Sequence, residues 1–481
     1  MNQPSLPAEA QPAKTIDREA LPEREAGLHR KLTPWQLAMI GLGSCIGTGI
    51  FLGSAISVKL AGPAVILSFA GAAGIALTMM LALAEMAAAH PAAGSFGLYA
   101  EMYLNPWAGF AVRLTYWLCM MAAVGSEVVA ASIYCESESW LPRLPAWIWI
   151  ALFSALILYL NTVSVGNFGK FENGFSITKV VTIAVFLLLG SALLLGIGFP
   201  RIGLANYTAH GGFFPHGWTG VALGVVMGLF SFFGIEVVGS AAGEAANPKV
   251  AVPRALRRTL LILVVAYVAG LALVVGIVPW TEIGLGESPF VRVFRTAGIP
   301  AASHVMNLVV LTAALSSAMA NLYFGARLVF SLARGGYAPE PLGRLNKKGM
   351  PVIAVVATAA GMLIALALSS YFQGSAFVFM VGLSTFGALF AWSMTLLTHM
   401  AFRRYHGRTQ KPYLRIGPSG PWVSLLGLAA VLAVLISTWW VPGFRITLTA
   451  GLPWLAFATV CYFVWGRSRS QQSAGGESRN G

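Results

Sequence analysis

The stretch G-S-C-I-G-T-G, residues 43–49, decides how this chain folds, because it places three glycines inside an apolar segment. The surrounding segment, 35–59, is long enough to cross a membrane as one helix, which takes about 20 apolar residues. Each glycine would cost such a helix roughly 1 kcal/mol relative to alanine. Non-helical backbone at membrane depth persists only where it is buried in protein or lines a cavity. The stretch therefore predicts an interrupted membrane helix; the alternative is close helix packing through small residues.

The composition of the whole chain agrees with a membrane protein. Of its 481 residues, 57% are hydrophobic and only 10% are charged. A soluble protein of this length would need a far larger polar surface. The cysteines lack the spacing of a disulfide framework or a metal site, and no Ser/His/Asp cluster indicates an active site. We therefore expect no cofactor, no bound metal and no enzyme activity.

Twelve segments of the chain are long and apolar enough to be membrane spans. They lie at about 35–59, 63–90, 106–133, 145–164, 172–198, 217–243, 256–281, 302–333, 351–370, 375–402, 421–441 and 443–466. With both termini on one side, the loops of that side hold most of the basic residues, whereas the opposite loops hold only Arg143, Arg201, Arg292, Arg295 and Arg445. This bias predicts that both termini are cytoplasmic.

The same bias accounts for the net charge of +14, so we expect no nucleic-acid partner. The polar residues 1–33 do not have the pattern of a signal peptide. Residues 467–481 are rich in Ser, Gly and Arg. Both segments are predicted to be disordered cytoplasmic tails that flank a membrane domain over 34–466.

A second departure from a regular span is F-S-F-F-G-I-E, residues 230–236, which combines a mid-span Gly234 with the ionisable Glu236. It occupies the same place in the second block of five spans, about 217–402, as the first break occupies in the block 35–198. Interrupted spans at matching positions of two halves indicate a midplane binding site in a transporter. The pairing makes packing through small residues the weaker interpretation.

Interrupted helices have a chemistry of their own. A broken helix leaves N–H groups at one end and C=O groups at the other. The N–H end attracts a carboxylate, and the C=O end attracts an ammonium group or another cation. A site with both ends is matched to the zwitterion of an α-amino acid.

Several stretches resemble the amino acid–polyamine–cation superfamily. They are I-G-L-G-S-C-I-G-T-G-I-F-L-G-S-A (40–55), F-S-F-F-G-I-E-V-V-G-S-A-A-G-E-A-A-N-P (230–248), G-E-S-P-F (286–290) and S-L-A-R-G-G-Y-A-P (331–339). More narrowly, the chain resembles bacterial amino acid permeases of the aromatic/GABA/lysine type, from about Leu28 to Gly466. The resemblance implies an all-α membrane protein of twelve helices. It implies a five-plus-five inverted repeat with discontinuous helices 1 and 6, and two extra C-terminal helices, about 421–466. It also implies proton-coupled uptake of amino acids by alternating access through the inner membrane of a bacterial cell.

The resemblance also implies roles for particular residues. The unwound residues that match the family's cradle for the substrate's carboxylate and ammonium groups are Cys45, Ile46, Gly47, Thr48 and Gly49. Phe230 matches an aromatic gate that lies over bound substrate in relatives. Phe233 and Gly234 match the break in the second interrupted helix.

The span 302–333 departs from the pattern of the family. Relatives usually read A-L-S-x-x-N-S-x-x-Y there, whereas this chain reads A-L-S-S-A-M-A-N-L-Y. Ser316, Met319 and Ala320 are candidate pocket residues, and the departure leaves the transported side chain open. The apolar Phe230 and Met319 favour a neutral or aromatic substrate, whereas a glutamate in the pocket would favour a cationic one.

Glu127, Lys179 and Glu236 lie inside spans, where ionisable groups are costly unless paired or hydrated and are functional candidates. Lys179 matches a family lysine that projects towards the unwound part of the first helix, which implies that its protonation replaces sodium binding. Glu236 is the second candidate for proton coupling, because burial penalises a charged carboxylate. Glu127 is either a structural polar pair or part of the pocket wall. Glu85 and Glu244 are expected to pin helix ends.

Two other functions share these features. An exchanger would use the same cradle to swap one amino acid for another without proton work, and counterflow with and without a pH gradient distinguishes it from a symporter. A non-transporting sensor is disfavoured, because the predicted tails are too short for a signalling domain. The expected partners are an amino acid, protons and the lipid bilayer.

Overall fold

The computed structural model describes residues 33–90, 95–163, 165–198, 202–240, 245, 247–346, 350–372, 374–406 and 420–466. All regular elements within these ranges are helices. In this part of the chain, 10 helical stretches are long and apolar enough to cross a membrane. The prediction of an all-α polytopic membrane protein is confirmed. The predicted tails lie outside the described residues, except for Thr33.

The helices divide into those before and those after the long loop that precedes Gly217. The first group consists of α1 (Pro34–Cys45), α2 (Ser54–Ala61), α3 (Val65–Ala89), α4 (Ser95–Tyr103), α5 (Pro106–Glu136), α6 (Ala146–Val163) and α7 (Val165–Leu195). The second group consists of α8 (Gly217–Phe232), α9 (Val237–Ser240), α10 (Pro248–Ile277), α11 (Pro289–Thr296), α12 (Pro300–Arg334), α13 (Val352–Tyr371), α14 (Ala376–Tyr405), α15 (Pro421–Ser437) and α16 (Arg445–Cys461).

Each predicted span corresponds to helical structure, with two differences. The first span is divided into α1, a π-helical turn at Gly49–Gly53 and α2, and the helical path continues into α3, so that Gly49–Ala89 forms one apolar stretch. The apolar helix Ala146–Thr162 is shorter than the 10 stretches counted above. The count of twelve spans and the five-plus-five repeat therefore stay predictions.

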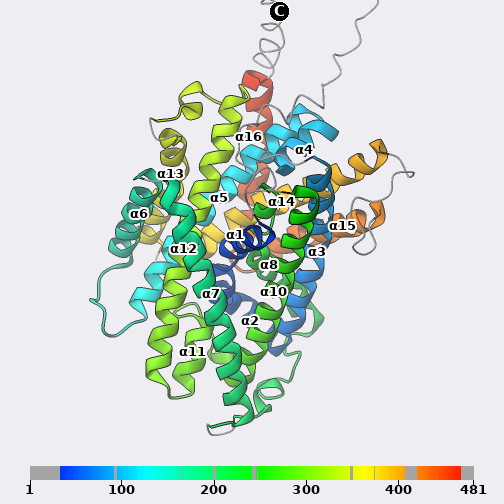
Figure 1. Ribbon diagram of the computed structural model, residues 1–481. Helices are drawn as coiled ribbons and strands as arrows, with labels where there is room; N and C mark the ends of the chain where they lie inside the picture. The colour runs from blue at the N-terminus through cyan, green and yellow to red at the C-terminus, as the bar shows by residue number, and fades with distance from the viewer. Residues whose placement is uncertain are drawn as a thin grey trace, which may run out of the picture.

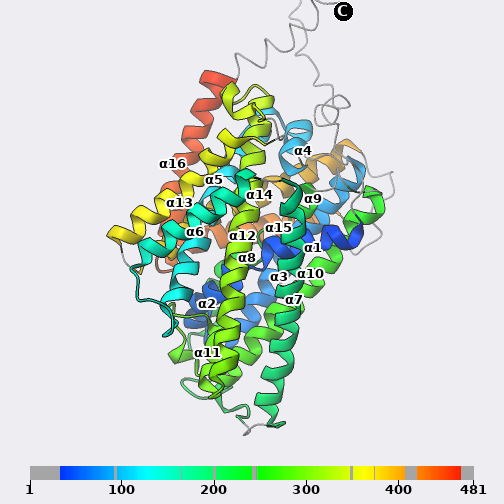
Figure 2. The same ribbon diagram turned by 60° about the vertical axis from the view of Figure 1, so that its left-hand side comes forward.

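The interrupted helices lie in the middle of the bundle. Figures 1 and 2 show α1 and α2 meeting about halfway along its length, among the longer helices α7, α10 and α12. Nearly all of α5 is buried, since it packs against α12, α13 and α14. Side chains of α5 can therefore reach the point where α1 ends.

Two short helices fall outside the predicted spans. In both views, α4 and α11 lie at opposite ends of the bundle. α4 is joined to α5 by an ion pair between Glu101 and Arg113, 3.0 Å apart and almost fully buried. Helices of this length cannot cross a membrane, so they do not appear as apolar spans in the sequence.

Glu85, near the end of α3, holds α3 against α14. Its carboxylate lies 2.9 Å from Nε2 of His399 and accepts a hydrogen bond of 2.7 Å from Arg403. Nδ1 of His399 lies 2.7 Å from the hydroxyl of Ser424 on α15. A buried carboxylate is tolerated when it is paired in this way. Glu85 therefore pins a helix end, as expected, whereas Glu244 lies outside the described residues.

Candidate functional site

The first break follows Cys45, where α1 ends. The backbone leaves the helical region at Ile46, with φ −80° and ψ 85°. A Cβ atom on Gly47 would lie 2.6 Å from Oε1 of Glu127 and 2.7 Å from Oγ of Ser317. A larger residue there would force the side chains of Glu127 and Ser317 to move, because real Cβ atoms do not approach other atoms so closely. The prediction of an interrupted first helix is confirmed.

The second break follows Phe232, where α8 ends. Phe233 is extended, with φ −63° and ψ 141°, and Gly234 has φ +103°. This positive φ strongly favours glycine. A Cβ atom on Gly234 would lie 3.0 Å from the backbone of Ser44 in α1. The two breaks are therefore in direct contact.

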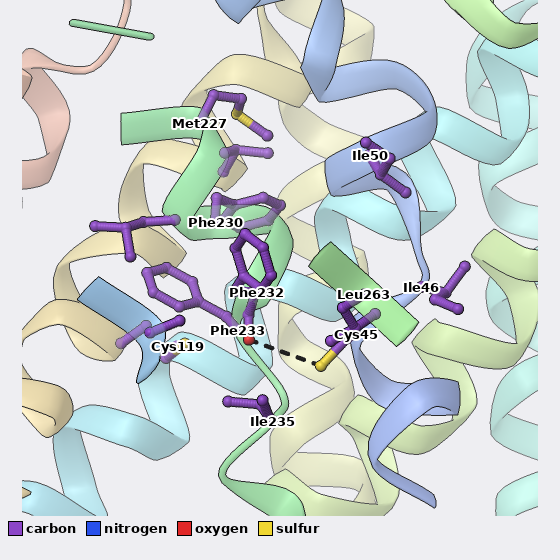
Figure 3. Close-up of a cluster of buried hydrophobic side chains, with 14 of the residues drawn as sticks. Cys45, Ile46, Ile50, Cys119, Met227, Phe230, Phe232, Phe233, Ile235 and Leu263 are labelled. Carbon is purple, nitrogen blue, oxygen red and sulfur yellow. Dashed lines mark hydrogen bonds between the residues drawn. The ribbon is translucent and has the colours of Figure 1, made fainter. Parts of the chain in front are cut away.

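Figure 3 shows the two unwound chains side by side, with the α1 break opposite the α8 break. The Cys45 thiol points at the carbonyl oxygen of Phe232, 3.7 Å from its sulfur atom. The hydroxyl of Tyr267 in α10, whose ring packs against that of Phe232, donates to the Cys45 carbonyl at 3.0 Å. Both the thiol and the carbonyl of Cys45 are therefore bonded at the end of α1.

Two charged side chains lie at opposite ends of the first break. Lys179, on α7, donates from Nζ to the Gly43 carbonyl at 2.8 Å and is only 1% exposed. Glu127, on α5, accepts the backbone N–H of Thr48 with N···O distances of 3.3 and 3.4 Å. A cation at a helix C-terminus and an anion at a helix N-terminus both complement the helix dipole. Because its side chain is buried inside the protein, Lys179 does not extend to the membrane interface.

Glu127 also accepts a hydrogen bond of 2.9 Å from the hydroxyl of Ser317 on α12. The sequence left Glu127 open between a polar pair and the pocket wall. The structure shows the polar pair with Ser317 and places Glu127 directly against the unwound backbone at Gly47. Its part in a pocket wall stays a prediction.

Glu236 belongs to the second break. Its carboxylate accepts a hydrogen bond from the hydroxyl of Tyr116 on α5 and another, of 3.1 Å, from the backbone N–H of Gly234. Each break therefore has one backbone N–H bonded to a glutamate. Sequence reasoning missed Tyr116, although it precedes Glu127 by about three helical turns and so shares its face of α5.

Aromatic rings form one wall beside the breaks. Phe230 and Phe233 are edge-to-face, with ring centroids 5.8 Å apart. Phe230 lies against Gly49, because a Cβ atom there would be 3.1 Å from its ring. The ring of Phe233 packs against the buried Trp392 of α14, with ring centroids 5.1 Å apart. Figure 3 shows Phe233 pointing towards Cys119 of α5. The sequence did not single out Trp392.

The residues expected from α12 are all buried in that helix. They are Ser316, Met319 and Ala320. Ser317, the neighbour of the predicted serine, donates a hydrogen bond to Glu127 of α5, beside the first break. Adjacent residues of a helix face different directions, so the family pattern at Ser316 did not by itself identify Ser317.

The chain is similar to known proteins over nearly its whole length. A sequence profile described as amino acid permease matches residues 36–472. The chain is 34% identical to the uncharacterized amino acid permease YtnA of Bacillus subtilis (strain 168), over 94% of this chain and 98% of that protein. It is 35% identical to the aromatic amino acid transport protein AroP of Escherichia coli (strain K12), over 90% and 95% of the two chains. It is 33% identical to the gamma-aminobutyric acid permease of Bacillus subtilis (strain 168), over 94% and 97%.

Proposed function

The chain belongs to the amino acid permease family, and from that membership we propose that it is a secondary active transporter that imports an amino acid by proton symport. Amino acid transport is the function that the family and the named relatives support. Because these relatives are transporters, the chain is not an enzyme. The finer proposal concerns the driving ion, the substrate and the direction of transport.

One observation carries the proposal, namely the contact between the two helix breaks at Ser44 and Gly234. Broken helices in contact bring an N–H end and a C=O end together inside the bundle. We take the cradle to consist of the residues from Cys45 to Gly49, with Phe230, Phe233 and Gly234 opposite them. Such a cradle suits a molecule that carries a carboxylate and an ammonium group.

The transported molecule is proposed to be a neutral or aromatic amino acid. The rings of Phe230 and Phe233 lie at the breaks and offer an apolar surface. Met319 and Ala320 are candidates for the same wall. AroP is named for aromatic amino acids and the Bacillus relative for gamma-aminobutyric acid, and both kinds of molecule carry the two charged groups.

Proton coupling is proposed to involve Lys179 and Glu236. Lys179 places its ammonium group against the Gly43 carbonyl, at the end of α1. Loss of its proton would remove the positive charge there and weaken the link between α7 and α1. Glu236 bonds to both Tyr116 and Gly234, so a change in its charge would act on the second break.

The membrane location of the chain, its orientation and its helix arrangement are also proposals. We place the chain in the inner membrane of a bacterial cell with both termini cytoplasmic, because basic residues gather in the loops of one side. We also propose that residues 34–466 form a twelve-helix domain of two inverted five-helix repeats and two extra helices. The similar breaks after α1 and α8 support the repeat.

The test is uptake into proteoliposomes with and without an inward proton gradient. The panel consists of L-phenylalanine, L-alanine, L-lysine and γ-aminobutyrate. We expect the gradient to drive accumulation of one neutral member, and Lys179→Ala to abolish accumulation. Lys59→Ala, which changes an exposed lysine of α2, is the control and should accumulate as the wild type does. Undiminished accumulation by Lys179→Ala would contradict the role of Lys179, and counterflow indifferent to the gradient would indicate an exchanger.

A further inference from the structure

Two side chains of the protein place an ammonium group and a carboxylate at the ends of the first break. A bound amino acid would bring the same two groups. An ammonium group, from Lys179, bonds to the Gly43 carbonyl, and a carboxylate, from Glu127, bonds to the Thr48 N–H. An amino acid in the cradle would bring its own carboxylate to the N–H end of this break. The glutamate therefore occupies the position that the substrate's carboxylate needs.

There is little space for both carboxylates. Glu127 lies so close to the unwound backbone that a single Cβ atom on Gly47 would be 2.6 Å from its Oε1. Two carboxylates on one donor repel each other, and a shared site is tolerated when one of them takes a proton. Glu127 has an alternative partner in that state, because the hydroxyl of Ser317 can accept as well as donate.

We propose that the carboxylate of the substrate displaces the carboxylate of Glu127 from the N–H of Thr48, so that one proton binds Glu127 for each amino acid bound. This inference rests on the proposed function and names the group that links proton uptake to substrate binding. The proton comes from the solution on the side from which the substrate enters. It returns to the solution on the other side when the substrate leaves and Glu127 bonds to Thr48 again, and no covalent bond other than O–H changes.

The neighbours of Glu127 restrict which group takes this proton. The titratable groups near it are Lys179 from α7, Tyr267 from α10 and Tyr134 from α5 itself. α12 contributes the Ser317 hydroxyl, which is not charged. Of these groups, only Glu127 competes with a substrate carboxylate for a backbone N–H.

Glu85 serves as the matched comparison. It is also a buried glutamate of the bundle, but it is paired with His399 and Arg403. Neither the cradle nor the proposed proton coupling includes it. Glu85→Gln therefore removes a buried carboxylate without removing the proposed linkage.

The experiment measures the Kd of purified full-length protein between pH 5.5 and 8.5 by isothermal titration. The probe is L-phenylalanine, or γ-aminobutyrate if that is the molecule accumulated. When binding takes up one proton, Kd rises tenfold per pH unit over the range in which Glu127 is ionised in the free protein. We expect this rise in the wild type and in Glu85→Gln, and a Kd independent of pH in Glu127→Gln. The competitor 2-phenylethylamine, which lacks the carboxylate, should show no such rise.

A persistent rise in Kd for Glu127→Gln would overturn the inference. If Glu127→Gln does not fold, isothermal titration of the wild type in buffers of different ionisation enthalpy replaces it as the test. We expect binding to take up one proton for each amino acid bound; binding without proton uptake would overturn the inference. If the wild type accumulates substrate with the proton gradient but its Kd does not change with pH, only the role of Glu127 is refuted. The proposed function is then unaffected. A wild type that accumulates no member of the panel would refute the proposed function itself.

Discussion

Gly234→Ala tests whether the second break needs a backbone that only glycine adopts easily. Gly234 has φ +103°, and a side chain in so sparsely populated a region costs about 1–3 kcal/mol. The new methyl group would also lie 3.0 Å from three atoms of Ser44, two of which are backbone atoms that cannot rotate away. Overpacking of this kind costs about 1–3 kcal/mol. The two effects together destabilise the contact of the breaks by about 2–6 kcal/mol.

The assay is thermal unfolding of the purified protein in detergent, followed by tryptophan fluorescence, with uptake measured in parallel. The control is Gly74→Ala in α3, where no atom lies within 4 Å of the new Cβ. Alanine is the better helix former by about 1 kcal/mol, so this control should match or exceed the stability of the wild type. We expect Gly234→Ala to unfold at a clearly lower temperature and to lose uptake. Equal stability and uptake in the two variants would refute the reasoning about the break.

Two further predictions concern the end of the bundle where α4 lies. Arg113→Met should destabilise the protein by about 3–5 kcal/mol, because it leaves the buried carboxylate of Glu101 without its ion-pair partner. In a thermal unfolding assay, adding Glu101→Gln to the same chain should recover part of the lost stability. An Arg113→Met variant as stable as the wild type would contradict this. Burial, together with the nearby Glu101 carboxylate, raises the pKa of Tyr337. A raised pKa in the folded state contributes stability below the ordinary tyrosine pKa, about 10, that is lost as the pH rises above it. Tyr337→Phe should therefore lose stability less steeply than the wild type between about pH 10 and 12, and identical slopes in alkaline unfolding would count against the coupling.

The sequence predicted the two breaks because their causes are local. Gly47 and Gly234 interrupt apolar segments, and a glycine in a membrane helix has a conformational cost that can be recognised without any partner. The structure agrees at both positions, where one glycine allows close approach and the other adopts a positive φ. Lys179 was placed near the first break through the family resemblance, and its bond to Gly43 agrees with that expectation.

The partners of the breaks could not be read from the sequence. α5 is buried almost throughout, so its polar and apolar positions do not alternate in a way that identifies the face towards α1. The partner of Glu127 was left open, Tyr116 was not singled out, and Ser317 could not be distinguished from Ser316. Each acquires its role from a residue far away in the chain.

The sequence by itself determined the membrane class, the approximate spans, the two interruptions and the family. These depend on composition, on the length of apolar segments and on backbone preferences, all of which act over short stretches of chain. Only the tertiary structure decided that Glu127 lies on the amide end of the first break and Lys179 on its carbonyl end. The physical reason is that these contacts arise when α5 and α7 pack around α1, and packing joins residues that local preferences cannot relate.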